Sequence, residues 1–342
     1  MSMNESSLRQ PDILKDRKDY SIKRLDELKG ELSKLSETRA YPRLTIIAAG
    51  SLARHEASKH SDIDMFFFTA AEEIEDPRTK ELRLFGKIID VVDELGFPKF
   101  SRDCKYLNII STNEMFKNLG SPTDDHQNFF TARMLLLLES KFLYGETEYN
   151  ELIDSVIDYY YKDFDQHENN FKPTFLLNDI CRYWKTILLN YENKRTPNYN
   201  DGQIQESSRD RTKRKVQNYK LKYSRVITCF ATICAIGSLE PPVSSQKIKE
   251  LIRMTPRERL EQIAKNLPNT ASLINDILKK YSVFIEKTGL SEEDINKEFE
   301  NKERVEALFK GANHFGDLMF DLLEKIDKET SSDIKLIRHL VI

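Results

Sequence analysis

The sequence predicts an α+β fold, with an N-terminal α/β domain built on a small mixed sheet and an all-helical domain after it. Two short apolar runs, Leu44–Ala49 and Met65–Phe68, have the length and the β-branched or aromatic content of strands. From Tyr149 onward, apolar residues recur at helical spacing. We therefore place the first domain at residues 1–148 and the helical domain at residues 149–342.

The remaining elements of the first domain follow from the same periodicities. Leucines at helical spacing predict one amphipathic helix near the N-terminus, and Gly96 ends a second helix. The predicted elements are a helix over 12–38, a helix over 79–95, a strand over 105–111 and an apolar helix over 129–144.

The second domain is predicted to consist of helices separated by short polar breaks. Residues 192–215 are polar and are expected to form a loop that ends in the basic run Arg209–Lys215. Ser291 and Asp294 have the spacing of a helix N-terminal cap. The predicted helices cover 149–164, 174–191, 219–236, 246–267, 272–288, 291–311 and 314–327.

Composition restricts the class of protein. The 342 residues include 53 Lys and Arg against 56 Asp and Glu, a net charge of −3 that argues against a dedicated nucleic-acid binder. The four cysteines lack the spacing of a zinc site or a disulfide framework, as is typical of a reducing compartment. No apolar run is long enough to span a bilayer, so we expect a soluble cytoplasmic protein with no membrane partner. Nothing in the sequence indicates an oligomeric state.

Two aspartates precede the second apolar run. Asp62 and Asp64 lie two residues apart where a strand begins, so both should project from one face, with Ile63 buried on the other. Two carboxylates on one face repel each other unless a cation lies between them, and Mg²⁺ prefers such oxygen ligands. The alternative is that these aspartates merely begin a strand.

Gly50 and Ser51 follow the first strand. A glycine there lets the backbone approach a ligand closely, and consecutive N–H groups can hold phosphate oxygens. A phosphate-binding turn beside a carboxylate pair is typical of metal-assisted phosphoryl or nucleotidyl transfer.

These residues carry a family resemblance. Gly50-Ser51, Arg54, Glu56 and Ser61-Asp62-Ile63-Asp64 resemble the signature of the DNA polymerase β-type nucleotidyltransferase superfamily. The pattern is most similar to the bacterial branch that includes the uridylyltransferase of the PII signalling protein. The resemblance is strong over Leu44–Phe68, weaker to Gly145 and faint beyond it.

The resemblance implies site residues. Gly50 and Ser51 would bind the triphosphate, and Asp62 and Asp64 would hold one or two Mg²⁺ ions, with Mn²⁺ as an alternative. Asp103 would be the third catalytic carboxylate; Asp90 and Asp93 are alternatives on a predicted helix, where a solvent-facing position is expected, and the alternative to all three is that no third carboxylate exists. Arg54 would contact phosphate or fix the loop through Glu56; the alternative is a surface ion pair of little energetic value.

Superfamily enzymes also contact the triphosphate through cations of a following helical domain. Arg182, Lys185, Lys222 and Arg225 are the candidates here, with the active site expected in a cleft between the two domains. Each of these residues has the alternative of lying on a solvated helix face.

The function expected from the resemblance is transfer of NMP from an NTP, such as ATP or UTP, to an acceptor hydroxyl, with release of pyrophosphate. The branch favours a protein acceptor, while RNA and a small molecule stay open. The alternative is a catalytically weak nucleotide-binding regulator or scaffold of the same fold.

Overall fold

The computed structural model describes residues 12–100, 104, 107–195, 208–330 and 335–341. The chain divides into two units. The first, called the sheet unit, comprises Asp16–Phe171 and Val243–Thr255. The second, called the helical unit, comprises Met1–Lys15, Lys172–Pro242 and Pro256–Ile342.

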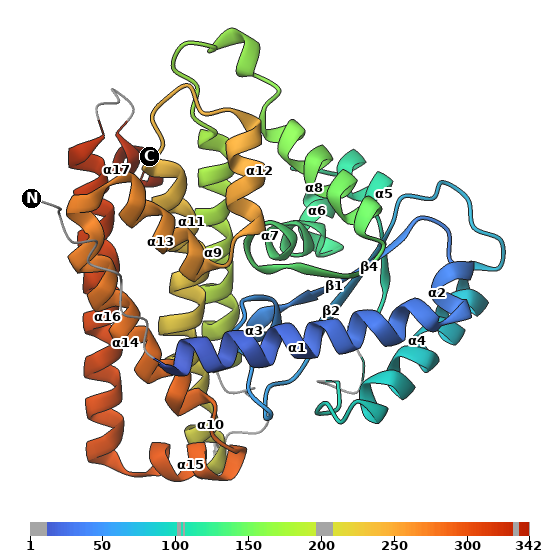
Figure 1. Cartoon of the computed structure of the whole chain (residues 1–342), viewed down its shortest axis with the longest axis horizontal. Coiled ribbons are helices and arrows are strands. Elements are labelled where there is room, and N and C mark those ends of the chain that lie inside the picture. Colours follow the sequence, from blue (N-terminus) through green and yellow to red (C-terminus); the bar gives the residue numbers. More distant parts are fainter. Residues whose placement is uncertain (1–11, 101–103, 105–106, 196–207, 331–334, 342) are drawn as a thin grey trace, which may run out of the picture. The chain divides into compact units, whose positions relative to one another are not determined.

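A four-stranded mixed sheet, with strand order β3-β2-β1-β4, lies in the sheet unit and confirms the predicted α+β class (Figure 1). The central strands β1 (Leu44–Ala49) and β2 (Asp64–Thr69) are antiparallel. Strand β3 (Ile109–Ser111) pairs in parallel with β2, and β4 (Lys141–Tyr144) pairs antiparallel with β1.

Strand β4 corrects the predicted helix over 129–144. Helix α7 spans Phe129–Glu139, and the chain then becomes extended at Ser140 before β4 begins. The run Lys141–Tyr144 is as apolar as the helix before it, but two of its four residues are aromatic and it completes the hydrogen bonding of β1. Gly145, with φ +71°, follows directly and opens α8 (Glu146–Tyr160).

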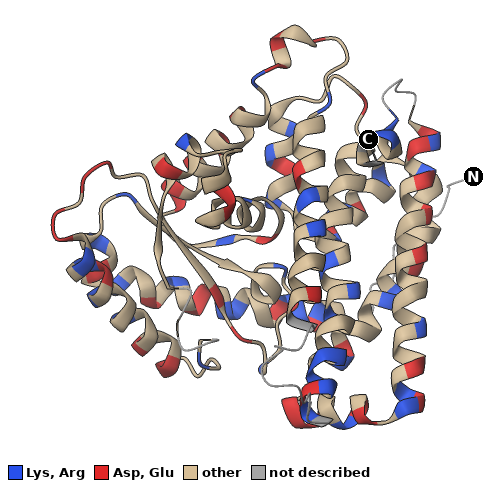
Figure 2. Ribbon diagram, turned by 180° about the vertical axis from the view of Figure 1, so that it is seen from behind, with Lys and Arg blue, Asp and Glu red and all other residues tan. Residues whose placement is uncertain are grey.

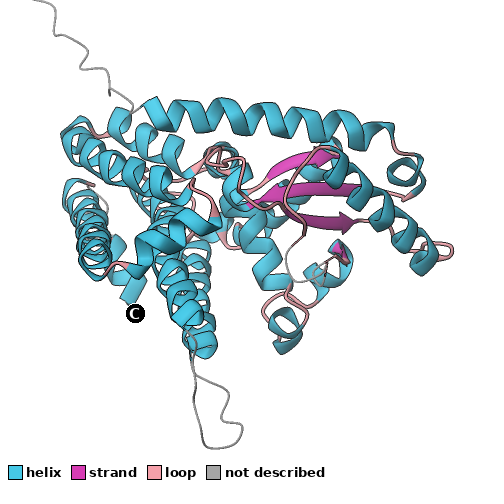
Figure 3. Ribbon diagram, turned by 90° about the horizontal axis from the view of Figure 1, so that it is seen from below, coloured by secondary structure: helices cyan, strands magenta, loops and turns pink. Residues whose placement is uncertain are grey.

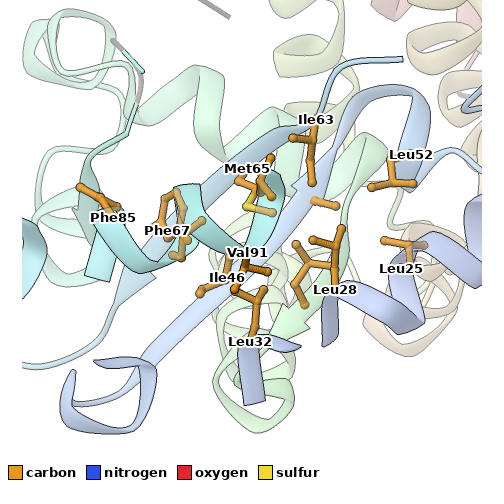
Figure 4. Packing of buried hydrophobic residues seen from close by; sticks show 14 of the residues in the cluster. Leu25, Leu28, Leu32, Ile46, Leu52, Ile63, Met65, Phe67, Phe85 and Val91 are labelled. Atoms are coloured by element: carbon orange, nitrogen blue, oxygen red, sulfur yellow. The ribbon is translucent and has the colours of Figure 1, made fainter. Parts of the chain in front are cut away.

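One face of the sheet is covered by α1 (Asp12–Lys34) and α4 (Pro77–Glu94). Leu25, Leu28 and Leu32 of α1 recur at helical spacing and point at Ile46 and Met65 of the sheet (Figure 4). Helix α4 contributes Phe85 and Val91 to the same cluster (Figure 4). The predicted helix over 12–38 is divided at Leu35, which is extended and precedes α2 (Ser36–Ala40).

The opposite face is covered by α7 and α8, so helices lie on both sides of the strands (Figure 3). Helix α12 (Ser245–Arg253) packs on α8 although about 90 residues separate them in sequence. Lys249 of α12 lies 3.5 Å from Asp154 and 3.2 Å from Asp158 of α8. For this reason the sheet unit extends to Phe171 and includes α12, whereas the sequence places the boundary at residues 148 and 149.

Shorter elements complete the sheet unit. They are α3 (Gly50–Ala53), α5 (Thr112–Lys117), α6 (Pro122–His126) and η1 (Phe164–Gln166). Asp124 of α6 and Arg133 of α7 form a fully buried pair in which two guanidinium nitrogens donate over 3.0 and 2.9 Å. This pair fixes α6 against α7, so Arg133 has a structural role.

The helical unit contains helices only, among its described residues. A π-helical turn, η2 (Leu221–Arg225), joins α10 to α11 in the middle of a long helical stretch. The elements are α9 (Thr174–Arg195), α10 (Ser208–Lys220), η2, α11 (Val226–Gly237), α13 (Pro256–Asn266), η3 (Pro268–Thr270), α14 (Ala271–Thr288), α15 (Glu292–Glu300), α16 (Lys302–Glu329) and α17 (Leu336–Val341).

Several predicted helix boundaries change. The predicted helix over 246–267 is two helices, because Pro256 begins α13. Asn301 ends α15 and caps α16, accepting a hydrogen bond from the Arg304 N–H. The Ser291 cap is confirmed, with Oγ accepting from the Asp294 N–H over 3.1 Å.

The basic run Arg209–Lys215 lies within α10 and is not a loop. Arg209 and Lys213 each lie 3.8 Å from Glu292 of the acidic helix α15. Figure 2 shows blue residues of α10 beside red residues of α15. Part of the positive charge of this run is therefore matched within the helical unit. Across the described part of the chain, no helix combines the length and apolar character needed to cross a bilayer.

Candidate active site

The motif Asp62-Ile63-Asp64 alternates as predicted at the start of β2. Asp62 and Asp64 are exposed, while Ile63 is 2% exposed and packs in the core beneath α1. Asp64 is the first residue of the strand and lies on the face that also carries Phe66 and Phe68. Ile63 is thus buried between two exposed aspartates, which is the burial pattern that the alternation predicts.

The Gly50 turn lies directly beside Asp64. Residue Ala49, the last of β1, pairs with Asp64 across the sheet, and Gly50 follows with φ +68°. A Cβ placed on Gly50 would lie 2.8 Å from Asp64 Oδ2. Glycine is therefore required twice, for its positive φ and for the space that the carboxylate occupies.

The turn after Gly50 is closed by its own backbone. The Arg54 N–H donates to Gly50 O over 3.0 Å, and the Glu56 N–H donates to Ser51 O over 2.8 Å. The carbonyl groups of Gly50 and Ser51 are thereby directed into the turn. The closed turn begins where β1 ends, beside Asp64.

A second closed loop, Ser58–Ser61, directly precedes Asp62. The Ser58 N–H donates to Ser61 Oγ over 2.9 Å, and the Ser61 N–H returns to Ser58 O over 3.0 Å. The serine of the Ser-Asp-Ile-Asp motif thus serves the backbone of its own loop. It holds the chain immediately before the carboxylate pair.

Arg54 forms a buried ion cluster and not a surface ion pair. Its Nε donates to Glu56 Oε2 over 2.7 Å, and its Nη1 donates to Glu139 Oε2. Its side chain is 6% exposed, and those of the two carboxylate partners are 7% and 0% exposed. The surface-pair alternative is therefore wrong, and the contact with Glu56 agrees with the interpretation that Arg54 fixes the loop.

Sequence reasoning did not identify Glu139 as a partner of the motif. It lies 85 residues after Arg54, at the end of α7, where it is the acidic residue in a largely apolar helix. A charged residue in such a run is a signal of a buried partner. The sequence does not show which residue that partner is.

The carboxylate pair fits a magnesium ion. Magnesium is commonly held by one or two protein carboxylates together with substrate phosphates, and Asp62 and Asp64 supply two exposed carboxylates where β2 begins. Among the described residues, no three or more Asp, Glu, His or Cys side chains converge into a complete protein metal site. Asp103, the predicted third carboxylate, lies outside the described residues.

The four predicted cations of the second domain all belong to the helical unit. Lys185 is exposed on α9, and Arg182 Nη1 lies 3.8 Å from Asp179 Oδ1 one turn earlier. Lys222 and Arg225 are both half-buried in the π-helical turn, where Lys222 Nζ donates to Asn313 Oδ1 over 3.0 Å. Their role towards the triphosphate stays a prediction.

A mixed sheet carries a glycine turn at the end of one strand and a pair of aspartates at the start of the next. Residues 25–114 match the family model of the nucleotidyltransferase domain, and all of them lie in the sheet unit. The chain therefore carries a nucleotidyltransferase domain, consistent with the DNA polymerase β-type superfamily. Comparison with curated proteins and with solved structures found no match. A domain of this class implies transferase activity on an NTP.

Proposed function

We propose that the protein is a metal-dependent nucleotidyltransferase that moves NMP from an NTP to an acceptor hydroxyl and releases pyrophosphate. The acceptor oxygen forms a bond to the α-phosphorus, and the bond from that phosphorus to the bridging oxygen breaks. The proton of the acceptor hydroxyl is released, and the pyrophosphate leaves with the bridging oxygen.

The residues of the turn and the strand have separate tasks in this proposal. Gly50 and Ser51 bind the β- and γ-phosphates through backbone N–H groups. Asp62 and Asp64 hold the magnesium, which when bound supplies positive charge to the phosphates during transfer. Arg54, Glu56 and Glu139 hold the turn in place.

One observation carries the proposal. The carboxylate of Asp64 lies against Gly50, so one predicted metal ligand adjoins the predicted phosphate-binding turn. If these aspartates only began a strand, no contact with a glycine of positive φ would be required. The resemblance to the uridylyltransferase branch favours a protein hydroxyl, such as that of a tyrosine, as the acceptor.

The test is transfer of label from each α-³²P-labelled NTP with Mg²⁺, with and without cell lysate. We expect label on a protein of the lysate, together with pyrophosphate, for the wild type, and none for Asp62→Ala. Asp19→Ala is the matched control, because Asp19 is an exposed aspartate on α1. It should transfer label at the wild-type rate.

The same experiment separates the alternatives. Label on RNA or on a small metabolite would keep the reaction and replace the acceptor class. Magnesium-dependent NTP binding without pyrophosphate release, for every NTP, would contradict the proposal and favour the nucleotide-binding regulator. Full transfer by Asp62→Ala would also contradict it.

A further inference from the structure

The sheet unit has a pocket of about 520 Å³ that the proposed reaction does not use. Its lining comes from the beginning of β1, the end of β2, the start of α5 and the length of α8. This volume falls in the range of small-molecule sites, roughly 300–1,000 Å³. The pocket therefore has room for an extended organic molecule.

The pocket lies at the other end of the central strands from the candidate active site. Thr45 and Phe68 line it and pair across β1 and β2, whereas Ala49 and Asp64 pair at the active-site end. Phe68 lies four positions after Asp64 on β2, a distance of about 13 Å at the usual rise per residue. The pocket is thus a distinct site that shares two strands with the catalytic motif.

Carboxylates dominate the charge of the lining. Four acidic residues and two basic residues line the pocket. Arg43 is bound to Glu151, and Asp158 is bound to Lys249 over 3.2 Å. Glu72 and Glu148, by contrast, have no cationic partner within salt-bridge distance among the described residues. The lining can therefore accept additional positive charge.

These carboxylates do not converge as metal ligands do. Among the described residues, no three Asp, Glu, His or Cys side chains are grouped closely enough to hold a metal ion. A single hard cation would leave most of the pocket volume empty. The charge therefore matches a cation that is extended, with positive groups separated along a chain.

The remaining lining is suited to an organic ammonium. The partly exposed rings of Phe116 and Tyr159 belong to it, together with hydroxyl side chains, while Phe68 is fully buried. The Lys162 ammonium, also part of the lining, already lies 3.8 Å from the centroid of the Tyr159 ring. Aromatic rings attract ammonium groups, and the contact between Lys162 and Tyr159 is an example of this attraction within the lining.

We propose that this pocket binds an aliphatic di- or polyamine. The ammonium groups contact Glu72 and Glu148, and the methylene chain lies along the aromatic part of the lining. The inference does not depend on the proposed reaction, because binding is measured without turnover.

The test is isothermal titration of the full chain with spermidine, with cadaverine and with 1,5-pentanediol, which matches cadaverine in length but carries no charge. We expect saturable binding of the two amines and none of the diol. Raising NaCl from 0.05 to 0.5 M (values chosen for the experiment, about a threefold change in Debye length) should weaken binding of the amines.

Paired variants test the two carboxylates. Glu148→Gln and Glu72→Gln should each raise the Kd for spermidine about tenfold, because each removes a charge-assisted hydrogen bond. Glu146→Gln and Glu73→Gln are matched controls, exposed neighbours outside the lining, and should leave the Kd within about twofold of the wild type. Equal binding of cadaverine and the diol, no binding of either amine, or an unchanged Kd in the Glu72→Gln/Glu148→Gln double variant would overturn the proposal.

Discussion

Asp64 occupies the space that a side chain at Gly50 would need, since a Cβ at Gly50 would lie 2.8 Å from Asp64 Oδ2. Asp64, the first residue of β2, pairs with Ala49, and Gly50 directly follows Ala49 at the end of β1. Any substitution at Gly50 therefore changes the position of a predicted metal ligand as well as the turn. This coupling separates Gly50 from the other glycines of positive φ.

Gly50→Ala tests the coupling, with Gly96→Ala as its control. Gly96 has φ +70°, close to that of Gly50 at +68°, but no atom lies within 4 Å of its added Cβ. Both variants should lose about 1–2 kcal/mol of stability from the left-handed backbone conformation. Only Gly50→Ala should also lose label transfer, because Asp64 must move. Equal rates of label transfer in the two variants would show that the close approach of Asp64 to Gly50 is not needed for activity.

The buried cluster around Arg54 predicts a large loss of stability. In Arg54→Met two carboxylates, Glu56 and Glu139, would lose their guanidinium partner in a buried environment. We expect a loss of about 3–5 kcal/mol in urea unfolding. Arg78→Met is the control, because Arg78 is also 2.7 Å from a glutamate, Glu81, but is 73% exposed, and should cost less than about 1 kcal/mol. Similar losses in the two variants would argue against a structural role for the cluster.

The central strands and the helices that cover one face of the sheet were predictable, because the spacing of apolar residues that indicates them lies within single segments. The two central strands, the α1 leucines and the break at Gly96 each follow from spacing within one segment. Strand β4 was not predictable in the same way, since Phe142 and Leu143 continue an apolar helical run and become a strand only by pairing with β1. The membership of α12 in the sheet unit likewise depends on contacts with α8 distant in sequence.

The site shows the same division. The positions of Asp62, Ile63 and Asp64 follow from strand alternation alone. Glu139 was missed because its partner Arg54 is 85 residues away, and the contact exists only after α7 has packed. Arg133, a charged residue in the same apolar helix, carries the same signal of a buried partner, but the sequence does not show that this partner is Asp124.

Because Asp62 and Asp64 are exposed, we expect a substitution there to change metal binding without lowering the stability of the fold. Asp62→Asn changes an exposed side chain, so its stability should lie within about 0.5 kcal/mol of the wild type. Added Mg²⁺ should raise the Tm of the wild type, because it binds the folded state, and should raise that of Asp62→Asn less. Differential scanning calorimetry with Mg²⁺ and with EDTA measures both. An identical magnesium shift in the two proteins would place the ion elsewhere.

The aromatic cluster of the helical unit predicts a loss of stability at alkaline pH. Tyr223 lies in the π-helical turn, with its ring 4.8 Å from Phe284 and 4.6 Å from Phe315, and burial raises its pKa to about 12 from an ordinary value of 10.0. Because the folded state holds this proton more tightly than the unfolded state, the contribution is complete below pH 10 and is lost as pH rises towards 12.

Urea unfolding between pH 8 and 11.5 (values chosen for the experiment, about the range over which tyrosine ionises) measures this contribution. The wild type should lose about 2 kcal/mol more than Tyr223→Phe across that interval, at about 1.4 kcal/mol for each unit of pKa shift. Tyr20→Phe, a half-buried tyrosine of α1, should follow the wild-type curve. If Tyr223→Phe also follows the wild-type curve, ionisation of Tyr223 does not limit the stability of the helical unit at high pH.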